Sequence, residues 1–217
     1  MVELVLASAS PRRSQLLRQL NLSFRTITPD IDETPLANES AGDYVQRMSD
    51  GKVSAAFGLL DPADVENPEL VVLCADTIVV LDGDILGKPV NESAGIEMLT
   101  RLSNRTHQVL TSVTLACPAS SQRESFSVET QVTFGVVARS DAERYWLSGE
   151  PQDKSGGYGI QGLGAIFVTS ITGSGSNVAG LPLQETAFWL ARFGIDCLPR
   201  HVSAAHVSEP QEVIQHG

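Results

Sequence analysis

The chain has 217 residues, 42% of them hydrophobic, and a formal net charge of −11. This length and composition allow a sizeable buried core in one domain or a two-lobed unit, and the acidic excess argues against a general affinity for nucleic acid or for anionic membranes. Three widely spaced cysteines fit neither a disulfide framework nor a zinc site, which favours a reducing, cytoplasmic compartment. A polyanionic ligand would therefore need positive side chains gathered at one place.

The beginning of the chain predicts a strand, a helix and a second strand. Residues 2–7 are apolar and rich in branched side chains, and the leucines that follow have helical spacing. Ser10 suits the N-cap of that helix, Pro11 its first turn and Asn21 its end, and the next strand is expected over residues 24–28. The opening run fits neither a secretory signal nor a membrane anchor, so we expect it to be the first buried strand.

The rest of the chain alternates between helical and extended patterns. A helix weakened by Gly51 is predicted over residues 41–60, and an acidic surface loop follows it. Residues 70–81, LVVLCADTIVVL, are apolar on both sides of one Asp-Thr pair, which is typical of a strand buried on both faces. The remaining expected elements are a turn at 82–84, a helix from Asn91 or Ser93 to Leu102, antiparallel strands at 107–117 and 125–137, a helix at 141–148, a strand at 165–171 and a helix at 181–193.

The junction between the first strand and the first helix, SASPRR at residues 8–13, has features that favour a phosphate-binding site. A helix start leaves backbone N–H groups unpaired, and the helix dipole favours an anion there. The serine hydroxyls add donors, and Arg12 and Arg13 add forked, permanently charged ones. An ordinary capped helix with two solvated arginines explains this segment equally well.

Asp76 and Thr77 interrupt the longest apolar run of the chain. A carboxylate buried without partners is costly, so Asp76 is either paired or placed at a strand end that faces a cleft. A partly desolvated Asp can bind a metal or take a proton from water, although capping a turn would be a structural alternative. The pattern favours the functional interpretation.

The segment GDILGKP, residues 83–89, resembles a P-loop only superficially. It has three residues between its glycines where a P-loop has four, and Pro89 follows the lysine where the magnesium-binding Ser or Thr belongs. Lys88 can still offer a point charge to a phosphate, but a surface lysine at a turn is the ordinary alternative.

Residues 148–164, SGEPQDKSGGYGIQGLG, predict a long loop rich in glycine and charge. Loops of this length in compact domains are often functional, although this one could be a flexible connection. Its glycines would let the backbone approach a ligand closely, and Gln161 offers a donor and an acceptor to the edge of a base. A dinucleotide-binding interpretation fails because the segment leads into a strand and not a helix.

Other polar residues give weaker signals. Asp30, Asp32 and Glu33 could be ligands of a hard cation, although acidic loops are usually just solvated. His107 is expected to be a strand residue and not a catalyst. The serines have no evident His and Asp partners, so nucleophilic catalysis has little support.

Taken together, these segments resemble the Maf family of nucleoside triphosphate pyrophosphatases over residues 4–194. The resemblance depends on the order and spacing of seven motifs, and it is specific as a set. They are SASPRR at 8–13, DE at 32–33, ADT at 75–77, GKP at 87–89, THQVLT at 106–111, SGEPQDKSGGYGIQG at 148–162 and GLPLQET at 180–186.

The resemblance implies an α/β fold of two lobes around a mixed twisted sheet, with flanking helices, a central cleft and possible homodimers. We expect one such domain over residues 1–197 and a flexible tail over 198–217. Family members split a nucleoside triphosphate into the monophosphate and pyrophosphate with a divalent metal, here Mg²⁺ or Mn²⁺. SASPRR, ADT and GYGIQG are similar to the branch that acts on dTTP and UTP, and modified pyrimidine nucleotides are an alternative substrate class.

The resemblance also implies roles for individual residues. Asp76 is expected to be the proton acceptor, with Lys88 and Arg13 as further catalytic residues and Glu33 and Asp76 as metal ligands. The residues expected to bind substrate or set its choice are Ser8, Arg12, Lys52, Thr77, Lys154 and Gln161. A non-catalytic nucleotide-binding regulator of cell division is the competing hypothesis.

The chain departs from the family pattern at three places outside this charged set. Asp50 and Gly51 stand where relatives have a smoother helical sequence, which would loosen the helix that carries Lys52. Asn104 replaces a usual glycine, and Gly175 stands where a tyrosine is common, which removes an aromatic contact from that loop.

Overall fold

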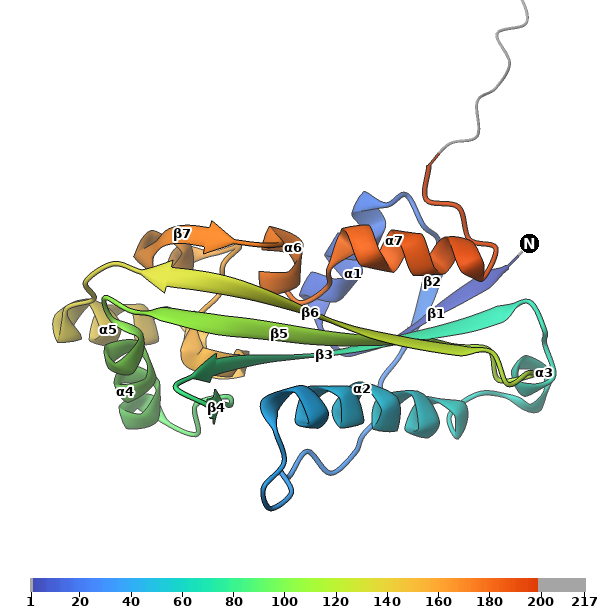
Figure 1. Cartoon of the computed structure of the whole chain (residues 1–217), viewed down its shortest axis with the longest axis horizontal. Helices are drawn as coiled ribbons and strands as arrows, with labels where there is room; N and C mark the ends of the chain where they lie inside the picture. The colour runs from blue at the N-terminus through green and yellow to red at the C-terminus, as the bar shows by residue number, and fades with distance from the viewer. Residues whose placement is uncertain (1, 199–217) are drawn as a thin grey trace, which may run out of the picture.

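A computed structural model describes residues 2–198 and shows a mixed, twisted, open sheet with helices on both faces (Figure 1). The strand order is β2-β1-β3-β5-β6-β7, and the short strand β4 pairs with the far end of β3. The strands are β1 (Glu3–Ala7), β2 (Phe24–Ile27), β3 (Leu70–Leu81), β4 (Asp84–Leu86), β5 (Thr106–Ala116), β6 (Arg123–Phe134) and β7 (Val168–Thr172).

Parallel and antiparallel pairing divide this sheet at β3. Strand β1 pairs in parallel with both β2 and β3, whereas every later pairing is antiparallel. The parallel pairs are reached through crossover helices, as parallel strands require, and the antiparallel β5 and β6 follow one another through a short loop. The predicted mixed α/β fold is therefore confirmed.

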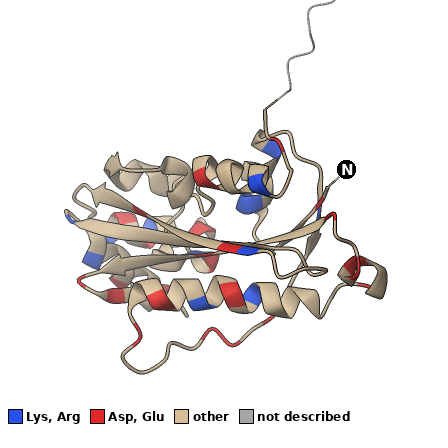
Figure 2. Cartoon of the chain, turned by 45° about the vertical axis from the view of Figure 1, so that its right-hand side comes forward, with Lys and Arg blue, Asp and Glu red and all other residues tan. Residues whose placement is uncertain are grey.

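The helices lie on both faces of the sheet and at one end of its long strands (Figure 1). In Figure 1, α2 runs along one face, α1, α6 and α7 lie on the other, and α4 and α5 pack together at the end of the long strands. Figure 2 shows acidic and basic residues along the length of α2. The helices are α1 (Pro11–Gln19), α2 (Ala41–Phe57), α3 (Pro62–Val65), α4 (Glu92–Leu102), α5 (Arg139–Trp146), α6 (Gly175–Val178) and α7 (Leu183–Arg192), with 3-10 turns η1 (Glu150–Asp153), η2 (Ser155–Gly157) and η3 (Leu163–Phe167).

Strand β3 contributes side chains to four clusters of the hydrophobic core, two on each face of the sheet. Its first half packs with β1, α1 and α7 on one face and with α2 on the other, through residues such as Leu73 and Val72. On one face, its second half packs with α4, α5 and the far ends of β5 and β6, through residues such as Val79. Of its twelve residues, only Asp76 and Thr77 are partly exposed. On the face that carries Val79, the two halves of β3 thus pack against different elements, and the strand is partly exposed where these halves join.

The sequence predicted most elements within a few residues, and the differences have physical causes. The strand expected at 165–171 begins only at Val168, because the preceding residues form the turn η3, in which the Ala165 amide donates to the carbonyl of Gly162. Strand β4 and helices α3 and α6 were not predicted, since three or four residues are too few to show a periodic pattern. Asn21, expected to end α1, adopts a left-handed conformation just beyond it, with φ of 54°.

The other predictions about the chain as a whole are tested only in part. Cys74, Cys117 and Cys197 are free thiols, as expected. Within residues 2–198, none of the helices combines the length and the hydropathy needed to cross a membrane. Apart from Leu198, the expected tail at 198–217 lies outside the described residues.

Candidate active site

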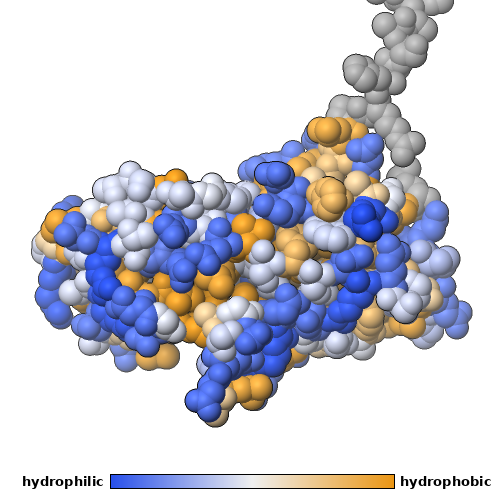
Figure 3. Space-filling view, viewed as in Figure 1, coloured by the Kyte–Doolittle hydropathy of each residue, from blue (hydrophilic) through white to orange (hydrophobic). Residues whose placement is uncertain are grey.

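A cavity of about 690 Å³ lies where β3 opens to solvent. Its size suits a ligand as large as a nucleotide. Its wall contains both charged side chains and an apolar set, and Figure 3 shows hydrophobic surface in the middle of the molecule between hydrophilic borders. The apolar set consists of Ile78, Val79, Ile85, Val109, Ile160 and Val178. The cavity could thus hold a partly apolar group together with a strongly charged one.

Asp76, Lys52 and Glu33 form a line of alternating charge at one side of this cavity. The Lys52 ammonium lies 2.5 Å from Oδ1 of Asp76 and 2.7 Å from Oε1 of Glu33. The side chains of Asp76 and Lys52 are each only 14% exposed, whereas that of Glu33 is 47% exposed. Helix α2 therefore delivers a cation to Asp76, which confirms the pairing that the sequence offered as one alternative. The expected strand end is wrong, because Asp76 faces the cavity from the middle of β3.

The electrostatics of this line favour the charged forms of Lys52 and Glu33. Burial acts to lower the pKa of Lys52, but Asp76 and Glu33 outweigh it and raise that pKa above its usual value. Burial acts to raise the pKa of Glu33, but the hydrogen bond and charge of Lys52 bring it below its usual value. Both groups are therefore ionised at neutral pH.

Tyr44 fixes the loop that carries Glu33. The Tyr44 hydroxyl donates to the backbone carbonyl of Glu33 at 2.8 Å. This hydrogen bond ties α2 to the segment that precedes it. Burial and the neighbouring carboxylates Asp76 and Glu33 raise the pKa of Tyr44 to about 12, so its hydroxyl stays protonated and keeps donating. The sequence analysis missed this residue, and its helical spacing in α2 gave no signal beyond a place in the core.

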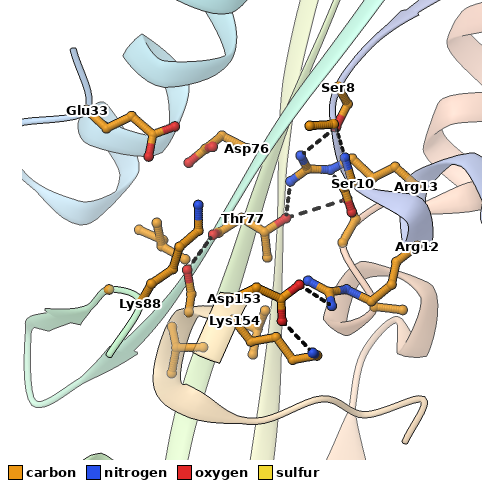
Figure 4. A pocket seen from close by; sticks show the side chains of 18 of the residues that line it. Ser8, Ser10, Arg12, Arg13, Glu33, Asp76, Thr77, Lys88, Asp153 and Lys154 are labelled. Carbon is orange, nitrogen blue, oxygen red and sulfur yellow. Dashed lines mark hydrogen bonds and ion pairs between the residues drawn. The ribbon is translucent and has the colours of Figure 1, made fainter. Parts of the chain in front are cut away.

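The Arg13 side chain links several segments by hydrogen bonds at the opposite side of the cavity. Its Nε donates to the carbonyl of Gly180 at 2.9 Å, its Nη1 to the Ser8 hydroxyl at 3.2 Å and its Nη2 to the Thr77 hydroxyl at 3.0 Å (Figure 4). Burial lowers the pKa of Arg13, although Asp76 counteracts this. Arg13 thus joins α1, the residue that follows β1, the strand β3 and the segment before α7, and any catalytic role would use its remaining N–H groups.

Thr77 belongs to a chain of hydroxyl groups that leads away from the cavity. Its hydroxyl lies 3.0 Å from that of Thr111 on β5, which donates to the carbonyl of Asn177 at 3.2 Å. Thr77 accepts from Arg13, and its own hydrogen has two acceptors within reach, the Thr111 hydroxyl at 3.0 Å and the carbonyl of Gly180 at 3.5 Å. The side chain of Thr77 therefore lines the cavity, while the observed partners of its hydroxyl group are protein groups.

Arg12, Lys154 and Lys88 are the other predicted cations, and all three line the cavity. The carboxylate of Asp153 lies 3.7 Å from Nη1 of Arg12 and 2.6 Å from Nζ of Lys154. Lys88 is exposed, and its ammonium points towards Asp76 in Figure 4. The predicted positive side chains, which are far apart in the sequence, therefore converge on one place.

Gln161 is the predicted site residue that the structure leaves outside. It is exposed, and the described residues that line the cavity include its neighbours Gly159 and Ile160 but not Gln161 itself. Its role in reading a base stays a prediction. Ser155, by contrast, was not singled out from the sequence: it lines the cavity and donates to the carbonyl of Thr77 at 3.2 Å.

The comparison with known families agrees with this geometry. The sequence model described as Maf-like protein matches residues 3–193, which include every charged residue of the cavity. The chain belongs to the Maf family. The family resemblance of the motifs is therefore confirmed, and the cavity is the place where those motifs of this Maf protein meet.

Several relatives of this Maf protein carry the name dTTP/UTP pyrophosphatase. One from Vibrio vulnificus (strain YJ016) is 46% identical over 193 residues, which cover 89% of this chain and 100% of the relative. One from Pseudoalteromonas atlantica is 47% identical over 192 residues, covering 88% and 97% of the two chains. One from Shewanella sp. (strain MR-7) is 48% identical over 199 residues, covering 89% and 100%.

The carboxylates of this Maf protein fit a divalent metal only together with a ligand. Asp76 and Glu33 face the same ammonium group, so a cation near them would meet two carboxylate oxygens. Residues 2–198 contain no cluster of three or more His, Cys, Asp or Glu side chains able to hold a metal alone. Magnesium is commonly bound through one or two carboxylates plus phosphates and waters, so the pair suits a metal that arrives with a triphosphate.

Proposed function

We propose that this Maf protein is a nucleoside triphosphate pyrophosphatase that hydrolyses dTTP and UTP to the monophosphate and pyrophosphate. The observation that carries the proposal is the gathering of Arg12, Lys52, Lys88 and Lys154 around Asp76 in one cavity of a chain whose net charge is −11. A chain so acidic overall has no general attraction for a triphosphate, so a site for one needs positive side chains gathered locally. The names of its relatives support the same substrates.

The positive side chains bind and orient the triphosphate. Arg12 and Lys154 line the cavity near the helix start at residues 8–13, where backbone N–H groups favour phosphate oxygens. Lys88 lies nearer Asp76, so it is placed to neutralise charge that develops on the leaving pyrophosphate. Phosphoryl transfer depends mainly on positioning and charge neutralisation, which this arrangement supplies.

Asp76 acts as the general base. It accepts a proton from a water molecule whose oxygen attacks the α-phosphorus in line, and the bond from that phosphorus to the bridging oxygen breaks as pyrophosphate leaves. Lys52 holds Oδ1 of Asp76 at 2.5 Å, which fixes the orientation of the carboxylate and leaves Oδ2 for the water. Glu33 and Asp76 would hold Mg²⁺ or Mn²⁺, which supplies Lewis-acid charge neutralisation when bound.

The loop around Gln161 selects the base. Ile160 and the other apolar residues would contact the face of a pyrimidine, while Gln161 would pair with its polar edge. A wrong base that leaves one polar group unpaired loses about 1–3 kcal/mol. Modified pyrimidine nucleotides stay an alternative substrate class. A cytoplasmic location and a homodimer are further parts of this proposal.

Replacement of Asp76 by Asn tests the proposal, because it keeps the shape of the side chain and removes the base. We expect Asp76→Asn to release UMP and pyrophosphate from UTP at least 100-fold more slowly than the wild type, as general base catalysis contributes about 10²–10⁴-fold. Asp141→Asn, an exposed change on α5 outside the cavity, is the matched control. A wild type that binds UTP without releasing pyrophosphate would instead support the nucleotide-binding regulator of cell division.

A further inference from the structure

Glu150, the first residue of η1, lies behind the cavity wall and takes part in none of the steps above. Its Oε1 accepts from the Tyr145 hydroxyl at 2.7 Å and from the amide of Gly164 at 3.1 Å. Its Oε2 accepts from the amide of Leu163 at 2.8 Å. One carboxylate therefore collects three donors, two of them from the backbone of a single loop.

That loop, residues 159–164, carries the prospective base-reading residue. Gly159 and Ile160 at its start line the cavity, and Gln161 follows them directly. The amide of Gly159 donates to the Tyr145 hydroxyl at 3.0 Å, and this hydroxyl donates to Glu150. Glu150 therefore holds the loop on both sides of Gln161, directly at one end and through Tyr145 at the other.

The glycines of the loop leave the space that the side chains of Glu150 and Tyr145 occupy. A Cβ atom on Gly162 would lie 2.3 Å from Oε2 of Glu150, and one on Gly159 would lie 2.8 Å from its Oε1. A Cβ on Gly164 would lie 2.6 Å from the Tyr145 hydroxyl oxygen. The sequence predicts that these glycines let the backbone approach a ligand, whereas in the structure Gly159 and Gly162 let it approach the Glu150 carboxylate and Gly164 lets it approach the Tyr145 hydroxyl.

Glu150 also anchors a cation of the cavity. Nζ of Lys154 donates to the backbone carbonyl of Glu150 at 2.6 Å. The side chain of Lys154 is only 14% exposed. Burial acts to raise the pKa of Glu150, but the hydrogen bonds from Tyr145, Gly164 and Leu163 lower it below its usual value. The carboxylate is therefore charged at neutral pH and can accept from all its donors at once.

We propose that Glu150 is a positioning residue for nucleobase selection, whose carboxylate shapes residues 159–164 into the wall that faces the base. This inference rests on the proposed function, because it concerns how that site discriminates among triphosphates. Glu150 touches no substrate in this account. It acts through Gln161, Gly159 and Ile160, whose backbone it holds in place.

Glu150→Gln tests the proposal, because the amide keeps the size of the side chain but offers an N–H group where one donor of the loop needs an acceptor. One donor of the loop then loses its acceptor and residues 159–164 lose their fixed shape, so we expect the KM for UTP and dTTP to rise about tenfold. The kcat should change less, and the preference for UTP over CTP should fall by a similar factor. Glu143→Gln, an exposed change on α5 that faces Arg139, is the matched control.

A double-mutant cycle with Gln161→Ala separates positioning from general destabilisation. If Glu150 acts through Gln161, then Glu150→Gln adds little to the loss of selectivity already caused by Gln161→Ala. An equal loss of kcat/KM for every triphosphate, or fully additive effects on selectivity, would overturn the proposal. If Glu150→Gln does not fold, Tyr145→Phe is the second test, because it removes the hydroxyl that links Glu150 to Gly159 and leaves the bonds from Leu163 and Gly164 to Glu150.

Binding measurements keep this inference distinct from the proposed function. The affinities of the wild type and Glu150→Gln for UTP and CTP are compared by calorimetry. If the wild type binds UTP but releases no pyrophosphate, the proposed hydrolysis fails, while a fall in the UTP-to-CTP affinity ratio still supports the role of Glu150. If the enzyme is active and Glu150→Gln leaves the UTP-to-CTP affinity ratio unchanged, only the role of Glu150 is refuted. A wild type that binds neither nucleotide overturns both the proposed hydrolysis and the role of Glu150.

Discussion

Replacement of His107 by Gln is expected to remove a large part of the acid sensitivity of this fold. His107 lies on β5 and is only 2% exposed, as expected of a strand residue. Its Nε2 lies 2.7 Å from the hydroxyl of Tyr158, and its ring packs edge-on against Phe134. Within the described part of the chain, its Nδ1 has no hydrogen-bond partner, so a second proton on the ring would be buried and unpaired.

The size of the effect follows from the pKa of this histidine. Burial lowers the pKa of His107 from 6.5 to about 4. A group whose pKa is lower in the folded state binds its proton more tightly in the unfolded chain, so folding loses stability as the pH falls below 6.5. One pH unit between the two pKa values is worth about 1.4 kcal/mol, which gives a loss of about 2 kcal/mol by pH 5 and about 3 kcal/mol by pH 4.

Urea unfolding of the wild type and of His107→Gln at pH 7, 6 and 5 measures this contribution. Gln can still reach the Tyr158 hydroxyl but does not titrate, and the carboxylates that also respond to acid are the same in both proteins. We expect the wild type to lose about 2 kcal/mol more of its unfolding free energy than His107→Gln between pH 7 and pH 5. Parallel curves over this range would show that His107 titrates normally and refute the reasoning.

Two further predictions concern the charges of the cavity. Lys52→Met leaves the carboxylates of Asp76 and Glu33 without the cation between them, so UTP turnover should fall by about 10²-fold or more, and a fall of less than threefold would contradict a role in orienting Asp76. Asp153→Asn frees Arg12 and Lys154 from a competing carboxylate, so the KM for UTP should fall by up to about fivefold at low salt. A rise in that KM would mean that Asp153 helps to hold the cations in place.

The sequence pointed to the carboxylate of the site because its position is unusual for a charged side chain. Asp76 stands in a run too apolar to bury a lone carboxylate, which predicted a partner or a cleft, and the structure shows both. The family resemblance extended this to Lys52 and Lys88, which no local pattern distinguishes from surface lysines. Both line the same cavity as Asp76.

Other features were not predictable because they depend on contacts between distant segments. The hydrogen bonds of Arg13 to Gly180 and Thr77 span 167 and 64 positions of the chain. The glycine-rich loop gave a correct prediction of an irregular segment, but nothing in its pattern shows that a carboxylate lies at its centre. The structure also leaves Gln161 exposed beside the cavity, where the sequence predicts a contact with the base.

The sequence by itself determined the class of this protein: alternating apolar periods set the strands and helices, and an ordered set of motifs indicated the Maf family. Only the tertiary structure decided which charges meet. The sheet brings the middle of β3 beside α2 and the start of α1, so the ion pair of Lys52 with Asp76 and the hydrogen bonds of Arg13 form across distances that no local pattern encodes. Hydrophobic spacing is a property of neighbours along the chain, whereas the electrostatics of a site depend on neighbours in space.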